Sequence, residues 1–229
     1  MNDISWFTKT KVTSALIVIA TLVVILGGFG INNAGYRTVV QYPNGTTWVK
    51  FDPGWYMTFF GKTQEYPDVL TFDYDDVQDT DSSVQENGLA VRYQDGGMGT
   101  TYGKDRFMLP TDEPTMLTLH KSFRSTEGLA NKLIRPVVKE SHQMTAGLMS
   151  SEGAYAEQRG TYISWVQDQV RNGKYVTRLS TVTVTDEVTN KSISKKVPVI
   201  ATEGGTPLHV KSDLTVYGVT LQGSQITNW

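Results

Sequence analysis

The chain has 229 residues, of which 21 are Lys or Arg and 23 are Asp or Glu, so its formal net charge is −2 with histidine neutral. This near balance excludes the strongly basic surface typical of nucleic-acid-binding proteins. The chain contains no cysteine, which excludes disulfide frameworks, cysteine-ligated metals and thiol nucleophiles. With 39% hydrophobic and 19% charged residues, the composition is that of a folded protein with one large domain or two small ones.

The amino-terminal part of the chain is strongly apolar. Residues 12–31 form a run of twenty without a charged residue, Asn, Gln or Pro. As one helix rising about 1.5 Å per residue, such a run spans the ~30 Å hydrocarbon core of a bilayer. The apolar region of a cleaved signal peptide is only about 7–15 residues long, so we expect a retained transmembrane anchor. Its apolar positions include Val12, Leu16, Ile19, Leu22, Val23, Leu26 and Ile31.

Basic residues beside the apolar run predict its orientation. Lys9 and Lys11 lie just before it, and lysines near a membrane segment favour the cytoplasmic side. Residues 1–34 are therefore expected to be a cytoplasmic amino terminus followed by a single membrane pass, and the rest of the chain is expected to lie across the membrane.

Residues 35–110 are predicted to be a β-rich subdomain. β-Branched and aromatic residues dominate this part and are interrupted by turn signals. Asn44 and Gly45, between apolar runs at 36–42 and 46–51, predict a β-hairpin. After it we expect a turn at Pro53 and Gly54, an aromatic run that stops at Gly61, and strands at 89–93 and 106–109 on either side of a flexible, glycine-rich turn at 95–103.

From residue 111 the spacing of apolar residues changes to about 3.6, which predicts a mixed α/β subdomain over 111–229. Pro136 removes a backbone donor inside the first helical pattern, so a kink or a helix restart is expected near Arg135. A second helix is expected over 154–172, with Gly173 as its carboxyl-terminal cap. The first pattern consists of Leu129, Leu133, Val137, Met144 and Leu148.

The last part of the chain returns to the alternation of strands. Thr177–Thr185 and Ser192–Ile200 lie on either side of a polar tip at 187–191 and predict a hairpin. A final strand is expected at 214–221. The expected fold class is α+β, with one N-terminal transmembrane helix, a β-rich subdomain, and a mixed α/β subdomain that carries an inserted hairpin at about 175–213.

Several short motifs occur in a recognisable order after the apolar run. There is a Pro-Gly step after the first hairpin, a proline in the first long helix, a Gln-Arg pair near the second helix, and a Tyr-Gly pair near the end of the chain. In this order they resemble the prohibitin/stomatin family, whose domain is called SPFH or band 7, and in particular its phage-encoded and bacterial members. The positions concerned are Pro53, Gly54, Pro136, Gln158, Arg159, Tyr217 and Gly218.

The resemblance implies an SPFH-like fold and a membrane-anchored, non-enzymatic scaffold that self-associates. Such a scaffold organises membrane microdomains or regulates a membrane-bound AAA protease. The implied partners are the lipid bilayer, further copies of the chain and that protease, with no nucleic acid. The implied localisation is the inner membrane of a bacterial host, as a single-pass protein with periplasmic carboxyl-terminal domains.

The sequence departs from the family in two ways. Segment 175–213 is longer than the expected connection, and no sustained heptad pattern follows the predicted closing strand before the sequence stops at Trp229. The longer segment leaves a second interpretation open, in which the chain is a membrane-anchored periplasmic binding or surface module that contacts its partner through the insertion.

Enzyme signatures are incomplete in this sequence. The glycine-rich segment 95–104 lacks the residues of a phosphate-binding loop, and the aspartates at 73–81 do not have the spacing of a calcium loop. His120, His142 and His209 lie far apart, without a metal-ligand motif. We therefore expect no catalytic, cofactor-binding or metal-ligating residue, and a protein that is not an enzyme.

Aromatic residues are concentrated shortly after the apolar run. One interpretation is a belt of rings at the membrane interface, where Trp and Tyr are enriched. The other is the inward-facing core of a hairpin, and the sequence does not distinguish the two. The residues are Trp48, Trp55, Tyr56, Phe59 and Phe60.

Overall fold

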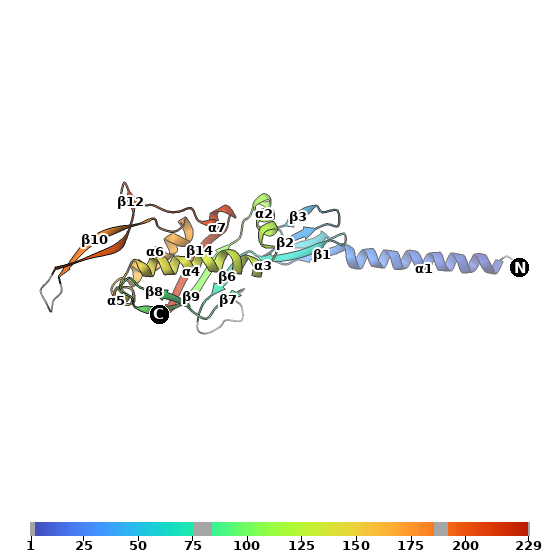
Figure 1. The fold of residues 1–229 in the computed structure, drawn as a ribbon. Helices are drawn as coiled ribbons and strands as arrows, with labels where there is room; N and C mark the ends of the chain where they lie inside the picture. Colours follow the sequence, from blue (N-terminus) through green and yellow to red (C-terminus); the bar gives the residue numbers. More distant parts are fainter. Residues whose placement is uncertain (1–2, 76–83, 186–191, 229) are drawn as a thin grey trace. The chain divides into compact units, whose positions relative to one another are not determined.

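The computed structural model describes residues 3–75, 84–185 and 192–228. They belong to two compact units, one that ends at Asp68 and one that begins at Val69 (Figure 1). The described chain contains both helices and β-sheets, in groups along the sequence, so the fold is mixed α/β. The subdomain limits predicted after residues 34 and 110 rest on composition and stay predictions.

Helix α1 (Asp3–Gly28) contains most of the apolar run, but strand β1 (Phe29–Asn32) takes up its end. The run of twenty residues is thus divided between a helix and a strand, whereas the length criterion requires one helix. Within the described ranges, no helix has both the length and the apolar character needed to cross a membrane. This finding contradicts the predicted transmembrane helix, the membrane anchor and the single-pass inner-membrane localisation.

The predicted anchor positions are distributed over these two elements. Val12, Leu16, Ile19 and Leu22 are exposed on α1, and Ile31 is exposed on β1. Val23 and Leu26 lie within the backbone of α1.

The first unit contains two small antiparallel sheets. Strand β2 (Tyr36–Gln41) lies between β3 (Thr47–Lys50) and β5 (Lys62–Pro67), and β1 pairs with β4 (Gly54–Met57). The predicted hairpin at Asn44 and Gly45 is confirmed, with Gly45 in the left-handed region at φ 87°. The predicted aromatic run is a strand only as far as Met57, because Phe59 and Phe60 adopt positive φ.

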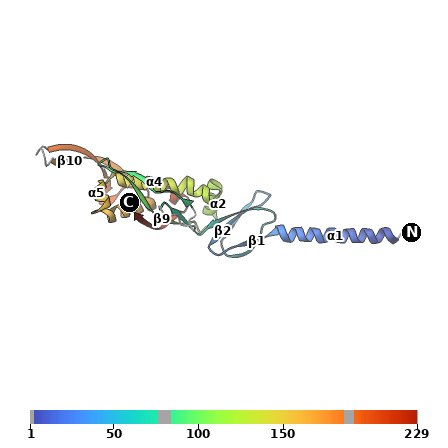
Figure 2. The ribbon, with the colours of Figure 1, turned by 90° about the horizontal axis from the view of Figure 1, so that it is seen from below.

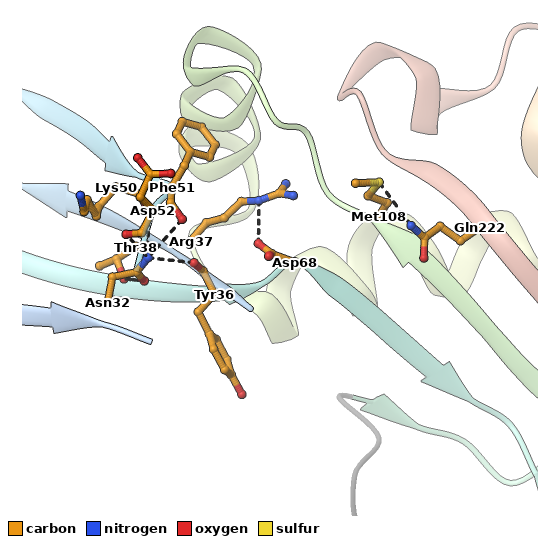
Figure 3. Close-up of polar contacts among 10 residues, drawn as sticks. All are labelled: Asn32, Tyr36, Arg37, Thr38, Lys50, Phe51, Asp52, Asp68, Met108 and Gln222. Atoms are coloured by element: carbon orange, nitrogen blue, oxygen red, sulfur yellow. Dashed lines mark hydrogen bonds and ion pairs between the residues drawn. The ribbon is translucent and has the colours of Figure 1, made fainter. Parts of the chain in front are cut away.

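A buried asparagine ties the loops of the first unit together (Figure 3). The Asn32 side-chain amide donates to the carbonyl oxygens of Tyr36 at 2.9 Å and Asp52 at 3.0 Å, with a longer contact to Phe51 at 3.3 Å. Its side-chain oxygen accepts from the Thr38 hydroxyl at 2.8 Å. This one side chain therefore satisfies polar groups from separate segments of the chain.

The sheet of the second unit has the order β14-β9-β6-β7, with β8 also paired to β9. Its strands are β6 (Val69–Asp73), β7 (Val84–Gln85), β8 (Leu89–Arg92), β9 (Met98–Met108) and β14 (Thr220–Asn228). Beside the β9–β14 pairing, the Gln222 amide donates to Met108 Sδ at 3.3 Å (Figure 3).

The predicted strand at 89–93 is confirmed, but the flexible turn predicted at 95–103 is mostly wrong. A tight turn, in which Tyr93 N donates to Gly97 O at 2.8 Å, separates β8 from β9, and β9 begins at Met98. Gly103 lies inside β9. A Cβ at this position would come within 2.3 Å of the Gln225 carbonyl oxygen in β14. The glycine therefore permits close approach of two strands.

The first helical region consists of α2 (Glu113–Phe123), α3 (Thr126–Leu129), a π-helical turn η1 (Ala130–Ile134) and α4 (Arg135–Gly147). The predicted restart near Arg135 is confirmed, with Pro136 in the first turn of α4. The π turn adds one residue to the repeat, so Val138 is buried while the predicted Val137 is only half-buried.

The predicted second helix is two helices, α5 (Ser151–Tyr155) and α6 (Arg159–Asn172). Tyr162, Val166 and Val170 are buried on one face of α6. Gly173 caps α6 at φ 107°, where a Cβ would meet the Val210 carbonyl oxygen at 1.8 Å. The cap prediction is confirmed.

At the end of the chain, β10 (Thr177–Thr185) and β11 (Ser192–Ile200) form the predicted hairpin, whose predicted tip lies outside the described residues. The short strands β12 (Thr202–Glu203) and β13 (Thr206–Pro207) follow. The strand predicted at 214–221 begins only at Thr220, in β14, because the Ser212 hydroxyl accepts from Leu214 N and caps helix α7 (Asp213–Val216) over the first predicted residues.

A histidine and an aspartate are buried in the core of the second unit. His142 has Nδ1 3.2 Å from both the Thr101 and Tyr162 hydroxyls, and burial lowers its pKa to about 3, so its ring is neutral. Burial also raises the pKa of Asp105 to about 7, against the opposing effect of the Ser224 hydroxyl. Among the described residues, neither carboxyl oxygen of Asp105 has a hydrogen bond of normal geometry.

Replacing Asn32 should destabilise the first unit. Asn32→Ala leaves several part-buried carbonyl groups without their donor and the buried Thr38 hydroxyl without its acceptor, at a cost of about 1–3 kcal/mol. Urea unfolding of the full chain measures the loss. The neighbouring Asn33 is exposed, so Asn33→Ala is the control and should change the midpoint little. Equal effects of the two substitutions would contradict the role given to Asn32.

Replacing Asp105 should change how stability depends on pH. The folded pKa of about 7 exceeds the unfolded value near 4, so the wild type loses stability as the pH rises from about 4 through 7. Asp105→Asn removes this loss. At pH 8 it should increase the free energy of unfolding by an amount on the order of a few kcal/mol and so raise the melting temperature, with little change near pH 4. Thermal unfolding from pH 4 to 9 tests this, with the exposed Asp213→Asn as control. A stabilisation equal at both ends would refute it.

Candidate interaction surface

The second unit carries a hairpin that forms a sheet of its own. We call β10 and β11 together the arm. Its nine residue pairs, from Thr177 with Ile200 to Thr185 with Ser192, follow one register without a bulge. In two views the arm extends from the helices of its own unit (Figures 1 and 2). A two-stranded sheet alone in water is only marginally stable, so this arrangement favours contact with another surface.

Apolar side chains occupy both faces of the arm. Val182, Val197 and Val199 share one face, where Val182 is 42% exposed. Leu179 lies on the opposite face beside Pro198 and is 71% exposed. If the arm packed on its own unit through one face, exposed apolar side chains would remain on the other face only. Because they occur on both faces, both faces are available to a partner.

The arm is basic, whereas the rest of the chain is acidic. Arg178, Lys195 and Lys196 are exposed, and the two strands contain no Asp or Glu. Without these three, 18 of the 21 basic residues face 23 acidic ones, which leaves a net charge of −5 elsewhere. None of the three forms an ion pair with a described residue.

Backbone hydrogen bonds join the arm to the segment after it. Val176 N donates to Leu208 O at 2.8 Å, Ala201 N donates to Val176 O at 2.7 Å, and Leu208 N donates to Ala201 O at 2.9 Å. Tyr175 and His209 form a further antiparallel bridge. The base of the arm is therefore three segments wide, whereas the arm itself has two strands.

One carboxylate connects this base to α6. Asp168 Oδ2 accepts from the Tyr175 hydroxyl at 2.5 Å and from His209 Nε2 at 2.9 Å, and Oδ1 accepts from the Asn172 amide at 2.7 Å. Burial opposes ionisation of Asp168, but these hydrogen bonds outweigh it and lower its pKa. Burial and the facing Asp168 carboxylate raise the pKa of the Tyr175 hydroxyl. Oδ2 thus holds the base of the arm, while Oδ1 makes a bond within α6.

A cavity of ≈110 Å³ lies beside this cluster, and Gln169, Gly173 and Ser212 help to line it. Typical small-molecule sites measure about 300–1,000 Å³. Two charged residues of the lining, Glu140 and Lys174, already form a pair at 2.7 Å. The geometry of this region therefore suits anchoring of the arm better than ligand chemistry.

The residues singled out for the family resemblance begin or end elements of structure. Gly54 opens β4 directly after Pro53, and Pro136 lies in the first turn of α4. Gln158 and Arg159 begin α6, while Tyr217 and Gly218 end α7. In the second unit these positions belong to different helices and do not form one site. The Tyr217 ring packs on Phe123 with centroids 4.8 Å apart.

The aromatic cluster divides between the two interpretations. Tyr56 is buried and its ring lies 6.4 Å from that of Trp48, as in a hairpin core. Trp55 is 72% exposed, and Phe59 and Phe60 are exposed as well. Contact between these rings and lipid stays a prediction.

The histidines do not converge in the structure. His142 lies in the core, His209 lies at the base of the arm, and His120 is half-buried on α2. No group of three or more His, Cys, Asp or Glu residues suited to a metal ion occurs within the described ranges. Of the aspartates at 73–81, Asp73 pairs with Lys104 at 3.2 Å, and positions 76–81 lie outside the described residues.

The sequence predicts the arm but not the Asp168 hydrogen bonds that hold its base. The alternation at 177–200 is a local signal, and the absence of acidic residues from both strands could have shown its charge. Asp168 and His209 are 41 residues apart and belong to no motif, so no local pattern connects them.

Comparison with known proteins does not place the chain in a family. No protein-family model matches it, and a search of curated proteins found no match. The resemblance to the SPFH domain therefore stays a prediction.

Replacing Asp168 should loosen the arm without unfolding the second unit. Asp168→Ala removes the acceptor for Tyr175 and His209, and hydrogen bonds to a charged group contribute about 1.5–3 kcal/mol when well shielded, less here because Asp168 is partly exposed. Amide hydrogen exchange should accelerate by roughly tenfold at the base of the arm, with core strands β6 and β9 unchanged. Uniform acceleration in all elements, or none in the arm, would contradict the anchoring role.

Proposed function

We propose that this protein is a non-enzymatic scaffold of the prohibitin-like SPFH type that self-associates, with the arm as its association element. The observation that carries the proposal is the arm itself, a nine-residue-long, two-stranded sheet with exposed apolar side chains on both faces. The SPFH resemblance supports the same function independently, since it implies lateral assembly.

The outer edges of the arm favour pairing with another chain. Along each strand, the backbone groups on the side away from the hairpin partner have no further strand beside them in the described part of the chain. Proteins usually protect such edges with bulges, proline or charge, because an open edge is a template for association. Strand β14 has two register shifts, whereas the arm has none. The arm therefore lacks the bulges of β14, and its edge protection is limited to Pro198 and the basic side chains.

The resemblance also supports lipid and a membrane-bound AAA protease as partners. The exposed rings of Trp55, Phe59 and Phe60 support contact with lipid headgroups, because such rings prefer the interface between water and hydrocarbon. On the paired strands β1 and β4, Ile31 lies opposite Trp55 and extends the same apolar face. This lipid contact forms part of the proposal and is independent of the arm.

A second candidate function is a binding module that captures a different protein through the arm. Arg178, Lys195 and Lys196, which form no ion pair with a described residue, favour this candidate if the partner surface is acidic. The two functions differ in what the purified chain does alone, because only the scaffold assembles without another protein.

Removing the arm should abolish assembly while leaving the second unit folded. Val176 and Ala201 are hydrogen-bonded neighbours, so residues 177–200 can be replaced by an Asn-Gly turn. Light scattering of the full chain in a mild non-ionic detergent, which masks the exposed apolar side chains of α1, measures the mass from about 1 to 100 µM. We expect a concentration-dependent oligomer for the wild type and a monomer for the deletion, with near-ultraviolet circular dichroism retained. A wild type that stays monomeric would refute the scaffold.

Trp55 provides a separate test of lipid contact. Vesicles that contain brominated phospholipid quench a tryptophan that reaches the interface, and we expect Trp55→Phe to remove part of the quenching. Trp165 belongs to α6 in the second unit, so Trp165→Phe is the control and should retain it. Equal quenching in both variants would contradict a contact through Trp55.

A further inference from the structure

The second unit has an exposed acidic and aromatic surface at α5. Glu152 and Glu157 are exposed on either side of Tyr155, which is 69% exposed. We call these three residues the α5 surface. Neither glutamate forms an ion pair with a described residue. The α5 surface therefore offers an exposed ring beside two acids that are not neutralised by a described residue.

The α5 surface is held in a defined position. The Asp95 carboxylate accepts from the Ser151 amide at 2.8 Å and from its hydroxyl at 2.6 Å, which joins the start of α5 to the turn between β8 and β9. These bonds to Ser151, with a further one from the Gly97 amide, lower the pKa of Asp95 to about 2. The Ser150 hydroxyl caps the helix by accepting from Gly153 N at 3.1 Å. The surface is therefore already ordered before any partner binds.

The arm and the α5 surface are complementary in charge and in apolar character. On one face the arm presents Arg178 and Lys195 with exposed Val182, and on the other it presents Lys196 with exposed Leu179. The α5 surface presents two exposed acids and an exposed ring. An exposed ion pair contributes only about 0.2–1 kcal/mol, so charge would set specificity and approach while apolar burial supplies affinity. A cation over the Tyr155 ring would add about 0.5–1 kcal/mol.

We propose that the arm of one copy docks on the α5 surface of a second copy. This inference rests on the proposed function and specifies its contact. Within one chain, the described residues contain no ion pair between Arg178, Lys195 or Lys196 and either glutamate. The Asp168 cluster and the three-segment base fix the direction of the arm, so the complementary surfaces are left for another molecule.

The contact joins two different surfaces, and each copy carries both. A heterologous contact of this kind repeats from copy to copy and produces a ring or a filament, according to whether the rotation closes. The proposal therefore predicts assembly of more than two copies from one type of interface.

A charge exchange tests the contact. The arm-reversed variant carries Arg178→Glu, Lys195→Glu and Lys196→Glu, and the α5-reversed variant carries Glu152→Lys and Glu157→Lys. Each should weaken self-association by roughly 10–100-fold in sedimentation of the full chain, and added salt should weaken the wild type. A mixture of the two variants should associate within about threefold of the wild type, because each reversed surface meets its reversed partner.

Matched controls separate this contact from general charge effects. Glu127 and Glu152 both lie in the first turn of a short helix with a serine cap, so Glu127→Lys repeats the local change away from the α5 surface. Lys62→Glu, Lys121→Glu and Lys139→Glu together repeat the charge change of the arm at exposed positions. Both controls should associate like the wild type, and circular dichroism verifies folding.

The outcomes distinguish the inference from the proposed function. If the arm-reversed variant is monomeric and the α5-reversed variant associates normally, or if the mixture does not recover, the arm docks elsewhere and the inference is overturned while the scaffold remains. If the wild type is monomeric, the scaffold itself fails. Recovery in the mixture, with unchanged controls, supports the contact.

Discussion

The candidate interaction surface depends on the hydrogen bonds that the Asp168 carboxylate accepts. The carboxylate accepts hydrogen bonds from Tyr175 and His209 and so connects the base of the arm with α6. A two-stranded sheet has too little buried surface to fix its own direction, and the connection to a packed helix supplies that constraint. An arm held in one direction pays less conformational entropy on binding than a free one, which makes association through a small surface feasible.

The sequence predicts elements well where the signal is local. The Asn-Gly hairpin, the helix restart at Pro136 and the cap at Gly173 all follow from one or two residues with restricted backbones, and the structure confirms them. Errors occur where a pattern spans a change of structure. The apolar run continues past Gly28 although the helix ends there, so the count of apolar residues predicted a membrane helix that the described chain does not contain. The one-residue shift at the π turn has the same origin.

The candidate site could be predicted only in part, because it depends on contacts between residues that are far apart in the sequence. Alternation predicts the arm, and its composition shows the basic charge. The position of Asp168 opposite His209 and of Asp95 opposite Ser151 depends on tertiary packing, which places residues 41 and 56 positions apart in contact. Both pairs are ordinary polar residues without a motif. The physical picture that results is of two ordered surfaces on one unit, each fixed by a carboxylate that serves as an acceptor and not as a reactive group.

Cross-linking between copies tests the central claim most directly, because the chain contains no cysteine of its own. One copy carries Thr181→Cys on the arm, and a second, differently tagged copy carries Ala156→Cys beside Tyr155, both at exposed positions. On mild oxidation we expect a mixed disulfide dimer that contains both tags, and little product when Ala156→Cys is replaced by the exposed Thr118→Cys on α2. Equal yields from the two pairs, or no mixed dimer at all, would contradict docking of the arm on a second copy.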